Sequence, residues 1–313
     1  MSAASASGRS VTVRAPAKLN LELTVGPRRP DGYHDLATVF HAVGLHDEVT
    51  VEPADDWEVV VTGPYAELVP CGADNLAMRA AHLIAEQATS SGPARITIDK
   101  EIPVAGGMAG GSADGAATLL ACDLLWEVGL SRGELEELAA DLGSDVPFAL
   151  AGGTAIGSGR GEQLVPVLAP GRYEWVLALS EGGLPTPEVY AECDRLRAGR
   201  RVPDPEPSED LMSALRAGDP RALGAALTND LQDAAFSLRP ELRGLLEVGL
   251  DFGALGGIVS GSGPTIAFLT ADVEGALDLS VALAASGAAP EVKRATGPAH
   301  GVHVVRSPSL RSL

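Results

Sequence analysis

Cysteine is scarce in this sequence. Cys71, Cys122 and Cys193 lie far apart in a chain of 313 residues, and no two of them form a Cys-x-x-Cys pair. An odd number of widely spaced cysteines indicates neither a disulfide framework nor a thiolate zinc site. A reducing compartment fits this composition best, so we expect a cytoplasmic protein.

Basic residues are also few. The chain has 23 Lys and Arg against 42 Asp and Glu, which gives a formal net charge of −19. Proteins that bind nucleic acids hold the phosphate backbone with dense basic surfaces, so we expect no nucleic-acid partner. Net charge describes association better than it describes a pocket, and a few local cations can still hold a small anionic ligand.

Long hydrophobic runs are missing as well. No apolar stretch is long enough to cross a bilayer, and residues 1–10 lack the apolar segment of a secretory signal. We therefore expect no membrane anchor and predict a disordered N-terminus at residues 1–10. The whole chain is 45% hydrophobic, and its length is enough for two globular domains of about 150 residues each.

The order of apolar residues and of turn residues predicts a mixture of strands and helices. We predict two strands at residues 11–15 and 19–25, broken at Pro16 and closed at Gly26-Pro27, and then a polar loop to Asp35. Further strands are predicted at residues 95–100, 175–179 and 265–269, and helices at residues 75–88, 112–128 and 131–142. His300 and His303 are interpreted as residues of the C-terminal tail.

The clearest chemical signal is a glycine-dense stretch between a predicted strand and a predicted helix. Its sequence is Pro103-Val104-Ala105-Gly106-Gly107-Met108-Ala109-Gly110-Gly111-Ser112. Glycines let a backbone approach a ligand closely, and a helix N-terminus offers unpaired N–H groups to phosphates. The stretch is not a P-loop, because Ser112 stands where that motif requires Lys, and it has no Gly-x-Gly-x-x-Gly. We interpret it as an anion cradle rather than a flexible linker.

Several motifs resemble those of the GHMP superfamily, the kinases for galactose, homoserine, mevalonate and phosphomevalonate. Its first motif is similar to Ala15-Pro16-Ala17-Lys18-Leu19-Asn20, its second to residues 103–113, and its third to Gly257-Ile258-Val259-Ser260-Gly261-Ser262-Gly263-Pro264. Within the superfamily, the run Asp31-Gly32-Tyr33-His34 and the segment Gly143-Ser144-Asp145-Val146-Pro147-Phe148 resemble the diphosphocytidyl-methylerythritol kinases.

This resemblance implies a two-domain α+β fold. The N-terminal domain, expected at residues 11–159, would be an ATP domain like ribosomal protein S5 domain 2. The C-terminal domain, expected at residues 160–313, would be ferredoxin-like. The active site would lie in the cleft between them.

The resemblance also implies a role for individual residues. Lys18 and Asp145 would be catalytic. The residues expected to bind ATP are Asn75, Pro103, Val104, Ala105, Gly106, Gly107, Met108, Ala109, Gly110, Gly111, Ser112 and Ala113. The residues expected to bind the other substrate are Asn20, Tyr33, His34, Gly261 and Ser262. ATP would be the co-substrate, accompanied by Mg²⁺ near the hydroxyl of Ser112.

Simpler structural roles remain open for several of these residues. Asp145 and Asn75 each precede a predicted helix and would make good N-caps. Lys18 would suit an exposed strand end, and Tyr33 and His34 would suit a packed or surface loop. Ala105 and Ala109 stand where glycines are common in the family, which puts the loop geometry in question if these positions need a positive φ. Arg28, Arg29 and Lys100 are candidate cations for diphosphate groups.

The implied reaction transfers the γ-phosphoryl group of ATP to the 2-hydroxyl of 4-diphosphocytidyl-2-C-methyl-D-erythritol. It belongs to the methylerythritol phosphate pathway of isoprenoid synthesis. One alternative is another small-molecule alcohol kinase of the same superfamily, and a second is a non-catalytic nucleotide-binding regulator.

Overall fold

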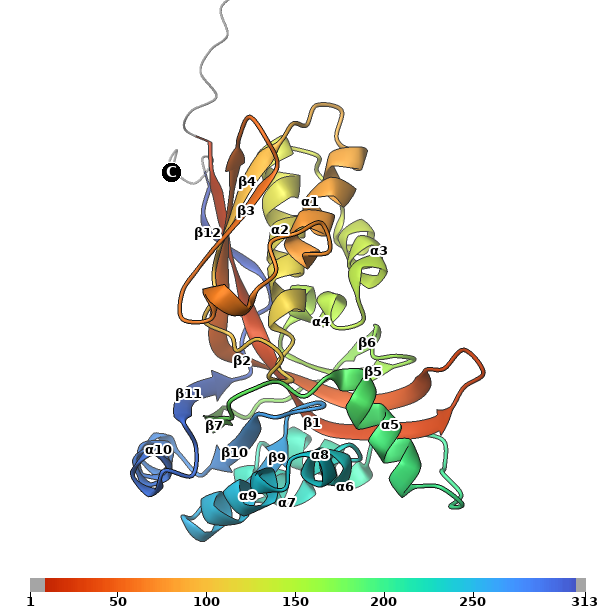
Figure 1. Cartoon of the computed structure of the whole chain (residues 1–313), viewed down its shortest axis with the longest axis vertical. Coiled ribbons are helices and arrows are strands. Elements are labelled where there is room, and N and C mark those ends of the chain that lie inside the picture. Colours follow the sequence, from red (N-terminus) through yellow and green to blue (C-terminus); the bar gives the residue numbers. More distant parts are fainter. Residues whose placement is uncertain (1–8, 308–313) are drawn as a thin grey trace, which may run out of the picture.

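The computed structural model describes residues 9–307, and most of the predicted disordered N-terminus lies outside this range. Two β-sheets organise the described residues (Figure 1). The larger sheet contains β1 (Val11–Arg28), β2 (His34–Pro53), β3 (Glu58–Thr62), β4 (Ala94–Asp99), β5 (Thr154–Ser158), β6 (Gln163–Pro166), β8 (Thr228–Asn229) and β12 (His303–Arg306). The smaller sheet contains β7 (Tyr173–Leu179), β9 (Gly256–Val259), β10 (Ile266–Thr270) and β11 (Glu291–Gly297).

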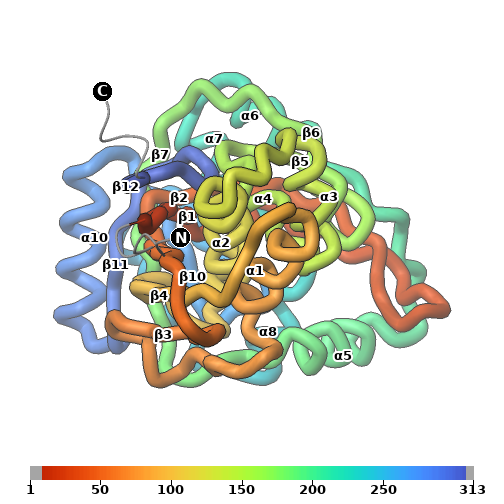
Figure 2. Tube along the Cα trace, turned by 90° about the horizontal axis from the view of Figure 1, so that it is seen from above, coloured from red at the N-terminus to blue at the C-terminus, as the bar shows by residue number. Residues whose placement is uncertain are grey.

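Helices cover one face of the larger sheet, and a second group of helices lies beside the smaller sheet and the β1–β2 ribbon (Figures 1 and 2). The first group contains α1 (Leu76–Gln87), α2 (Gly110–Trp126), α3 (Arg132–Leu142) and α4 (Val146–Ala151), with the short 3₁₀ helix η1 (Ala66–Leu68) nearby. The second group contains α5 (Thr186–Leu196), α6 (Glu209–Ala217), α7 (Pro220–Ala226), α8 (Gln232–Leu238), α9 (Glu241–Asp251) and α10 (Val273–Ser286). One continuous apolar core joins residues of both sheets, so the two halves are packed against each other.

Strands β1 and β2 form a long curved ribbon that runs from the upper half of the molecule to its lower half (Figure 1). We predicted two strands broken at Pro16, and this was wrong, because β1 is a single strand. Its pairing with β2 shifts register between Pro16 and Ala17. A bulge at this point accommodates a proline that has no N–H to donate. The predicted polar loop is correspondingly shorter, since β1 reaches Arg28 and β2 begins at His34.

The helix starts predicted near Asn75 and Ser131 are confirmed. The side chain of Asn75 accepts a hydrogen bond from the backbone N–H of Ala77 at the start of α1. Ser131 and Glu134 form a capping box at the start of α3. Each side chain satisfies backbone donors that the first turn leaves without partners.

The smaller sheet is antiparallel with the order β11-β7-β10-β9. In chain order, β7 is the first strand of this sheet, β9 the second, β10 the third and β11 the fourth. The spatial order is therefore 4-1-3-2, which is the order of a ferredoxin-like fold. Strands β6, β8 and β12 follow residue 160 but belong to the larger sheet. The division of the chain near residue 160 therefore remains a prediction. His303 lies in β12 and His300 bridges to Gly152, so our interpretation of both as tail residues was wrong.

Within residues 9–307, no helix combines the length and the apolar character that a membrane span requires.

Candidate active site

A cavity of about 910 Å³ lies where the β1–β2 ribbon, the glycine-dense stretch and α5 meet. Among the predicted site residues, those that line it are Lys18, Asn20, Tyr33, His34, Asn75, Pro103, Val104, Ala105, Gly106, Gly107, Ala109, Gly110, Gly111, Ser112, Asp145, Gly261 and Ser262. Met108 and Ala113 are fully buried in the apolar core instead. A single cavity thus gathers segments that are far apart in the sequence.

The glycine-dense stretch forms a tight loop that ends at the N-terminus of α2. Gly107 has a φ of 76°, and a Cβ at this position would lie 1.9 Å from the carbonyl oxygen of Ser260. The hydroxyl of Ser260 donates to the carbonyl of Gly107 at 3.0 Å, and the backbone N–H of Lys18 donates to the carbonyl of Met108 at 3.2 Å. The first and third motifs therefore hold the loop, and the start of α2 can meet phosphate groups in the cavity.

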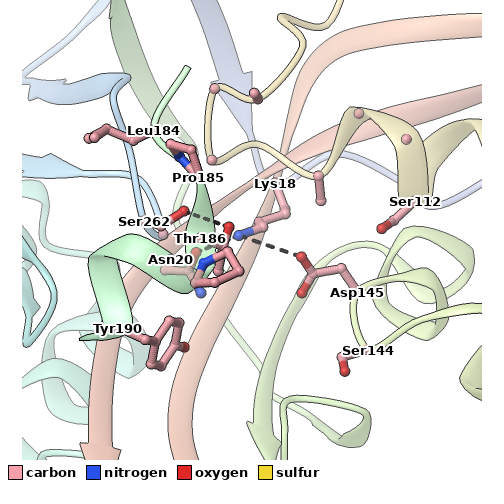
Figure 3. Close-up of a pocket in the computed structure, with 18 of the residues that line it drawn as sticks. Lys18, Asn20, Ser112, Ser144, Asp145, Leu184, Pro185, Thr186, Tyr190 and Ser262 are labelled. Carbon is pink, nitrogen blue, oxygen red and sulfur yellow. Dashed lines mark hydrogen bonds and ion pairs between the residues drawn. The ribbon is translucent and has the colours of Figure 1, made fainter. Parts of the chain in front are cut away.

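Lys18 and Asp145 face each other across this cavity (Figure 3). The Nζ of Lys18 lies 3.9 Å from Oδ2 of Asp145, and the side chains of the two residues are 8% and 33% exposed, respectively. Burial lowers the pKa of Lys18, and the charge of Asp145 partly opposes this shift. The pair combines a nearly buried cation with a carboxylate that a substrate can reach.

The alternative role of Asp145 as a helix cap is wrong. The residue occupies the N-cap position of α4, but its side chain makes no capping hydrogen bond. Pro147 lies in the first turn and removes one of the backbone donors that a cap would satisfy. The carboxylate of Asp145 is directed to Lys18 instead.

Asn20 contacts the ammonium group of Lys18. Its Oδ1 accepts from Nζ of Lys18 at 2.6 Å, and its Nδ2 donates to the hydroxyl of Thr38 at 2.8 Å. That hydroxyl in turn donates to the carbonyl of Glu22 at 2.6 Å. Because the proton of Thr38 is already used, its oxygen must accept, and this fixes the orientation of the Asn20 amide.

The turn of the β1–β2 ribbon meets α5 at the far end of the cavity. His34 is buried, and its Nε2 lies 2.9 Å from Oδ1 of Asp194. Its ring centroid is 5.3 Å from that of Tyr190, while the guanidinium of Arg160 lies 5.2 Å from the ring centroid of Tyr33. Burial, and then the charge of Asp145, raise the pKa of Tyr190.

Tyr190 and Asp194 were not predicted from the sequence. Their spacing of four residues places both on one face of α5, which is the signal that could have found them. Thr186, at the first turn of α5, was also missed, and its hydroxyl lies 3.0 Å from that of Ser262 (Figure 3). Helix α5 therefore contributes side chains along the length of the cavity.

Two of the three candidate diphosphate cations are engaged within the protein. Arg29 pairs with Asp31 and Asp35. Lys100 is buried, and its Nζ lies 2.5 Å from Asp47 and 2.7 Å from Asp114. Lys100 nevertheless lines the cavity, as do Arg28 and Arg160, and Arg160 was not predicted.

The carboxyl group of Asp114 is an unusual feature of this cluster. Burial raises its pKa to about 8, while Lys100 opposes the shift. One of its oxygens, Oδ1, is buried without a hydrogen-bond partner among the described residues. A neutral carboxyl group at this point leaves the charge of Lys100 balanced by Asp47 alone.

Comparisons with known proteins place these motifs in a family. The models of the GHMP kinase N-terminal and C-terminal domains match residues 75–153 and 211–289. The 4-diphosphocytidyl-2-C-methyl-D-erythritol kinase of Mycolicibacterium smegmatis is 56% identical over 96% of this chain and 94% of its own length. The kinase of the same name from Streptomyces avermitilis is 54% identical over 95% of this chain and 100% of its own length.

Solved structures agree with this assignment. A crystal structure of 4-(cytidine 5'-diphospho)-2C-methyl-D-erythritol kinase matches with a TM-score of 0.74 and 35% identity over 91% of this chain and 98% of its own. A homoserine kinase from Cytophaga hutchinsonii, 19% identical over 96% of this chain and 99% of its own, shares the fold with a TM-score of 0.70. These matches confirm the predicted GHMP fold, and the chain belongs to the 4-diphosphocytidyl-2-C-methyl-D-erythritol kinase family of the GHMP kinases.

Proposed function

We propose that this protein transfers the γ-phosphoryl group of ATP to the 2-hydroxyl of 4-diphosphocytidyl-2-C-methyl-D-erythritol, giving the 2-phosphate and ADP. The observation that carries the proposal is the Lys18–Asp145 pair, which shares one cavity with the glycine loop at the start of α2. Full-length similarity to kinases named for this substrate supports the choice of acceptor. The reaction is a step of isoprenoid precursor synthesis, and we propose that it takes place in the cytoplasm.

In the proposed mechanism, the carboxylate of Asp145 accepts the proton of the attacking hydroxyl. A positioned general base contributes typically about 10²- to 10⁴-fold to a rate. The ammonium of Lys18, oriented by Asn20, stabilises the negative charge that moves with the phosphoryl group. The N–H groups at the start of α2 hold the phosphates of ATP, so most of the catalysis comes from positioning and electrostatics.

The acceptor would lie along α5 with its cytidine at the far end of the cavity. Tyr33, His34 and Tyr190 gather aromatic rings and a polar edge there, which suits a neutral pyrimidine base. Arg28 and Arg160 would face its diphosphate. This arrangement would leave the methylerythritol end near Lys18 and Asp145.

Mg²⁺ would accompany ATP in this proposal. Within residues 9–307, no group of three or more acidic, His or Cys side chains forms a ready-made metal site. Mg²⁺ in kinases is held by one or two protein groups together with substrate phosphates, and the hydroxyl of Ser112 and the carboxylate of Asp145 line the same cavity. These residues fit such a site, where the ion would neutralise phosphate charge.

An ADP-release assay with Mg²⁺ and ATP tests the proposal. The acceptor 4-diphosphocytidyl-2-C-methyl-D-erythritol is compared with mevalonate, homoserine and galactose, and ³¹P NMR of the product identifies the phosphorylated hydroxyl. We expect turnover with the cytidyl acceptor alone. Turnover with another acceptor would overturn the substrate, and ATP binding without any turnover would favour the nucleotide-binding regulator.

A further inference from the structure

Asn229, the last residue of β8, and the next residue, Asp230, contact two different segments beside the active site. Strand β8 pairs with β1 through Glu22 and Leu23. The two side chains then go to different partners, one toward the third motif and one toward α5. Neither residue lines the cavity, so neither is expected to touch a substrate.

Asn229 is buried and fixes the backbone of the third motif. Its Nδ2 donates to the carbonyls of Val259 and Gly261, at 2.8 and 2.7 Å. Its Oδ1 accepts from the backbone N–H of Leu231 at 2.9 Å. Both donors of the amide are used, so the group has one orientation, and its loss would leave buried carbonyls without partners.

The third motif in turn abuts the groups proposed to react. A Cβ built on Gly261 would lie 3.2 Å from Nζ of Lys18 and 3.2 Å from the carbonyl oxygen of Gly107. Ser260, the residue before it, donates to that same carbonyl. A shift of Gly261 by a fraction of an ångström would therefore disturb both the lysine and the glycine loop.

Asp230 ties the C-terminal end of α5 to β1. Its Oδ2 accepts from the backbone N–H of Val25 at 2.8 Å and pairs with Nη2 of Arg197 at 2.8 Å. Arg197 is the C-cap of α5, and its Nη1 donates to the carbonyl of Val25. Arg197 follows Asp194 by three residues, so this anchor lies next to the part of α5 that contacts His34.

We propose that Asn229 and Asp230 are positioning residues that divide the active site between them. Asn229 places the third motif against Lys18 and the ATP loop, whereas Asp230 places α5 against the acceptor. The proposal rests on the proposed function for the names of the two substrates. A purely structural role predicts no such division, because each variant would then lose stability without a selective kinetic effect.

The test measures kcat and both KM values, per folded molecule, for Asn229→Ala and Asp230→Asn. For Asn229→Ala we expect kcat to fall and the KM for ATP to rise, roughly tenfold each, with the KM for the acceptor nearly unchanged. For Asp230→Asn we expect the KM for the acceptor to rise by roughly fivefold or more, with the KM for ATP nearly unchanged.

Thr270→Val is the matched control. Thr270 is buried in β10 and its hydroxyl also bonds to two backbone carbonyls, those of Glu174 and Asp272, but it does not line the cavity. We expect it to lower Tm and leave all three kinetic constants unchanged. If Asn229→Ala fails to fold, Ser260→Ala is the substitute. It removes the hydrogen bond from the Ser260 hydroxyl to the carbonyl of Gly107 and should raise the KM for ATP in the same way.

Unchanged constants in the two folded variants, or the same change in both, would overturn the proposal. Failure of the proposed function would be seen separately, in the turnover of acceptors by the wild-type enzyme. If the wild type uses a different acceptor, that acceptor serves in the same comparison. If the wild type turns over no acceptor, titration calorimetry with ATP tests the positioning roles instead. The Asn229→Ala variant should then bind ATP more weakly than the wild type, and the Asp230→Asn variant should bind it equally well.

Discussion

Asp145 directs its Oδ2 to Nζ of Lys18 at 3.9 Å, although it stands at the N-cap position of α4. A capping aspartate would give its oxygen to a backbone N–H two or three residues on. Here the carboxylate makes no such bond, so it is available to accept a proton from a bound hydroxyl. The Nζ of Lys18 also donates to Asn20, and this arrangement suits the proton acceptance and phosphoryl transfer that we propose for the pair.

Replacement of Asp145 by Asn should nearly abolish turnover and preserve ATP binding. The amide has the same shape but cannot accept the proton, and we expect kcat to fall by about 10² to 10⁴. ADP release measures kcat, and titration calorimetry measures the affinity for ATP. Asp141→Asn, an exposed position on α3, is the control and should keep full activity. An Asp145→Asn enzyme that is folded and fully active would exclude the general-base role.

The activity should decline at alkaline pH earlier than an ordinary lysine would allow. Burial lowers the pKa of Lys18 from 10.5, so its ammonium loses its proton at a lower pH than a solvated lysine does. The proposed mechanism needs the charged form of Lys18, and kcat should therefore fall as the pH rises through this lowered pKa. A profile of kcat from about pH 7 to about pH 10 measures the effect.

Lys18→Arg is the informative comparison for this profile. Arginine stays charged throughout the range, so the alkaline decline should disappear, although the different shape of the guanidinium should lower kcat at every pH. An unchanged alkaline decline in the Lys18→Arg enzyme would show that another group is responsible.

Asp114→Asn should stabilise the protein increasingly as the pH rises. The pKa of Asp114 is raised from 3.8 to about 8 in the folded state, so between these values the folded state binds more protons than the unfolded state. The contribution of Asp114 to the free energy of unfolding is fully present at acid pH and is lost as the pH rises toward 8. The asparagine variant does not titrate and keeps its stability, and its Tm advantage over the wild type should grow across this window and then level off.

Thermal unfolding at about pH 5, 7 and 9 checks this linkage. Asp278→Asn, at an exposed position of α10, is the control, since a solvated carboxylate contributes little to stability. A Tm difference between Asp114→Asn and wild type that stays constant with pH would contradict the prediction.

Local signals in the sequence were sufficient for the glycine loop and for the capped helices at Asn75 and Ser131, whereas Lys18 and Asp145 were singled out only by the resemblance to the GHMP kinases. Turn residues, caps and helical periodicity depend on neighbours in the chain, so they can be read without a structure. The β1–β2 ribbon was missed as a unit because a proline usually ends a strand, and only the pairing with β2 reveals the bulge that tolerates Pro16.

Long-range contacts account for the rest of what the sequence could not supply. Tyr190 and Asp194 can be assigned to the site only once α5 is seen to pack against His34, more than 150 residues away in the sequence. The cluster of Asp47, Lys100 and Asp114 likewise joins three segments. The structure also answers the question raised by the two alanines of the glycine loop, since Ala105 and Ala109 have φ values of 54° and 57°.

Replacement of Ala105 or Ala109 by Gly should stabilise the protein. A left-handed backbone costs an L-residue roughly 1–2 kcal/mol, and glycine avoids this cost. Glycine also makes the unfolded chain more flexible, which offsets about 0.4–1 kcal/mol, so the net gain per site should be of order 0.5–1 kcal/mol. Chemical denaturation measures the free energy of unfolding of each variant.

Ala140→Gly is the control, and it should lower the free energy of unfolding instead of raising it. Ala140 lies inside α3, where the backbone is helical and glycine costs about 1 kcal/mol relative to alanine. A uniform loss of stability in all three variants would mean that the loop does not keep its left-handed geometry in solution. A gain at Ala105 and Ala109 with a loss at Ala140 would show that the two alanines hold their left-handed backbone at the expense of stability.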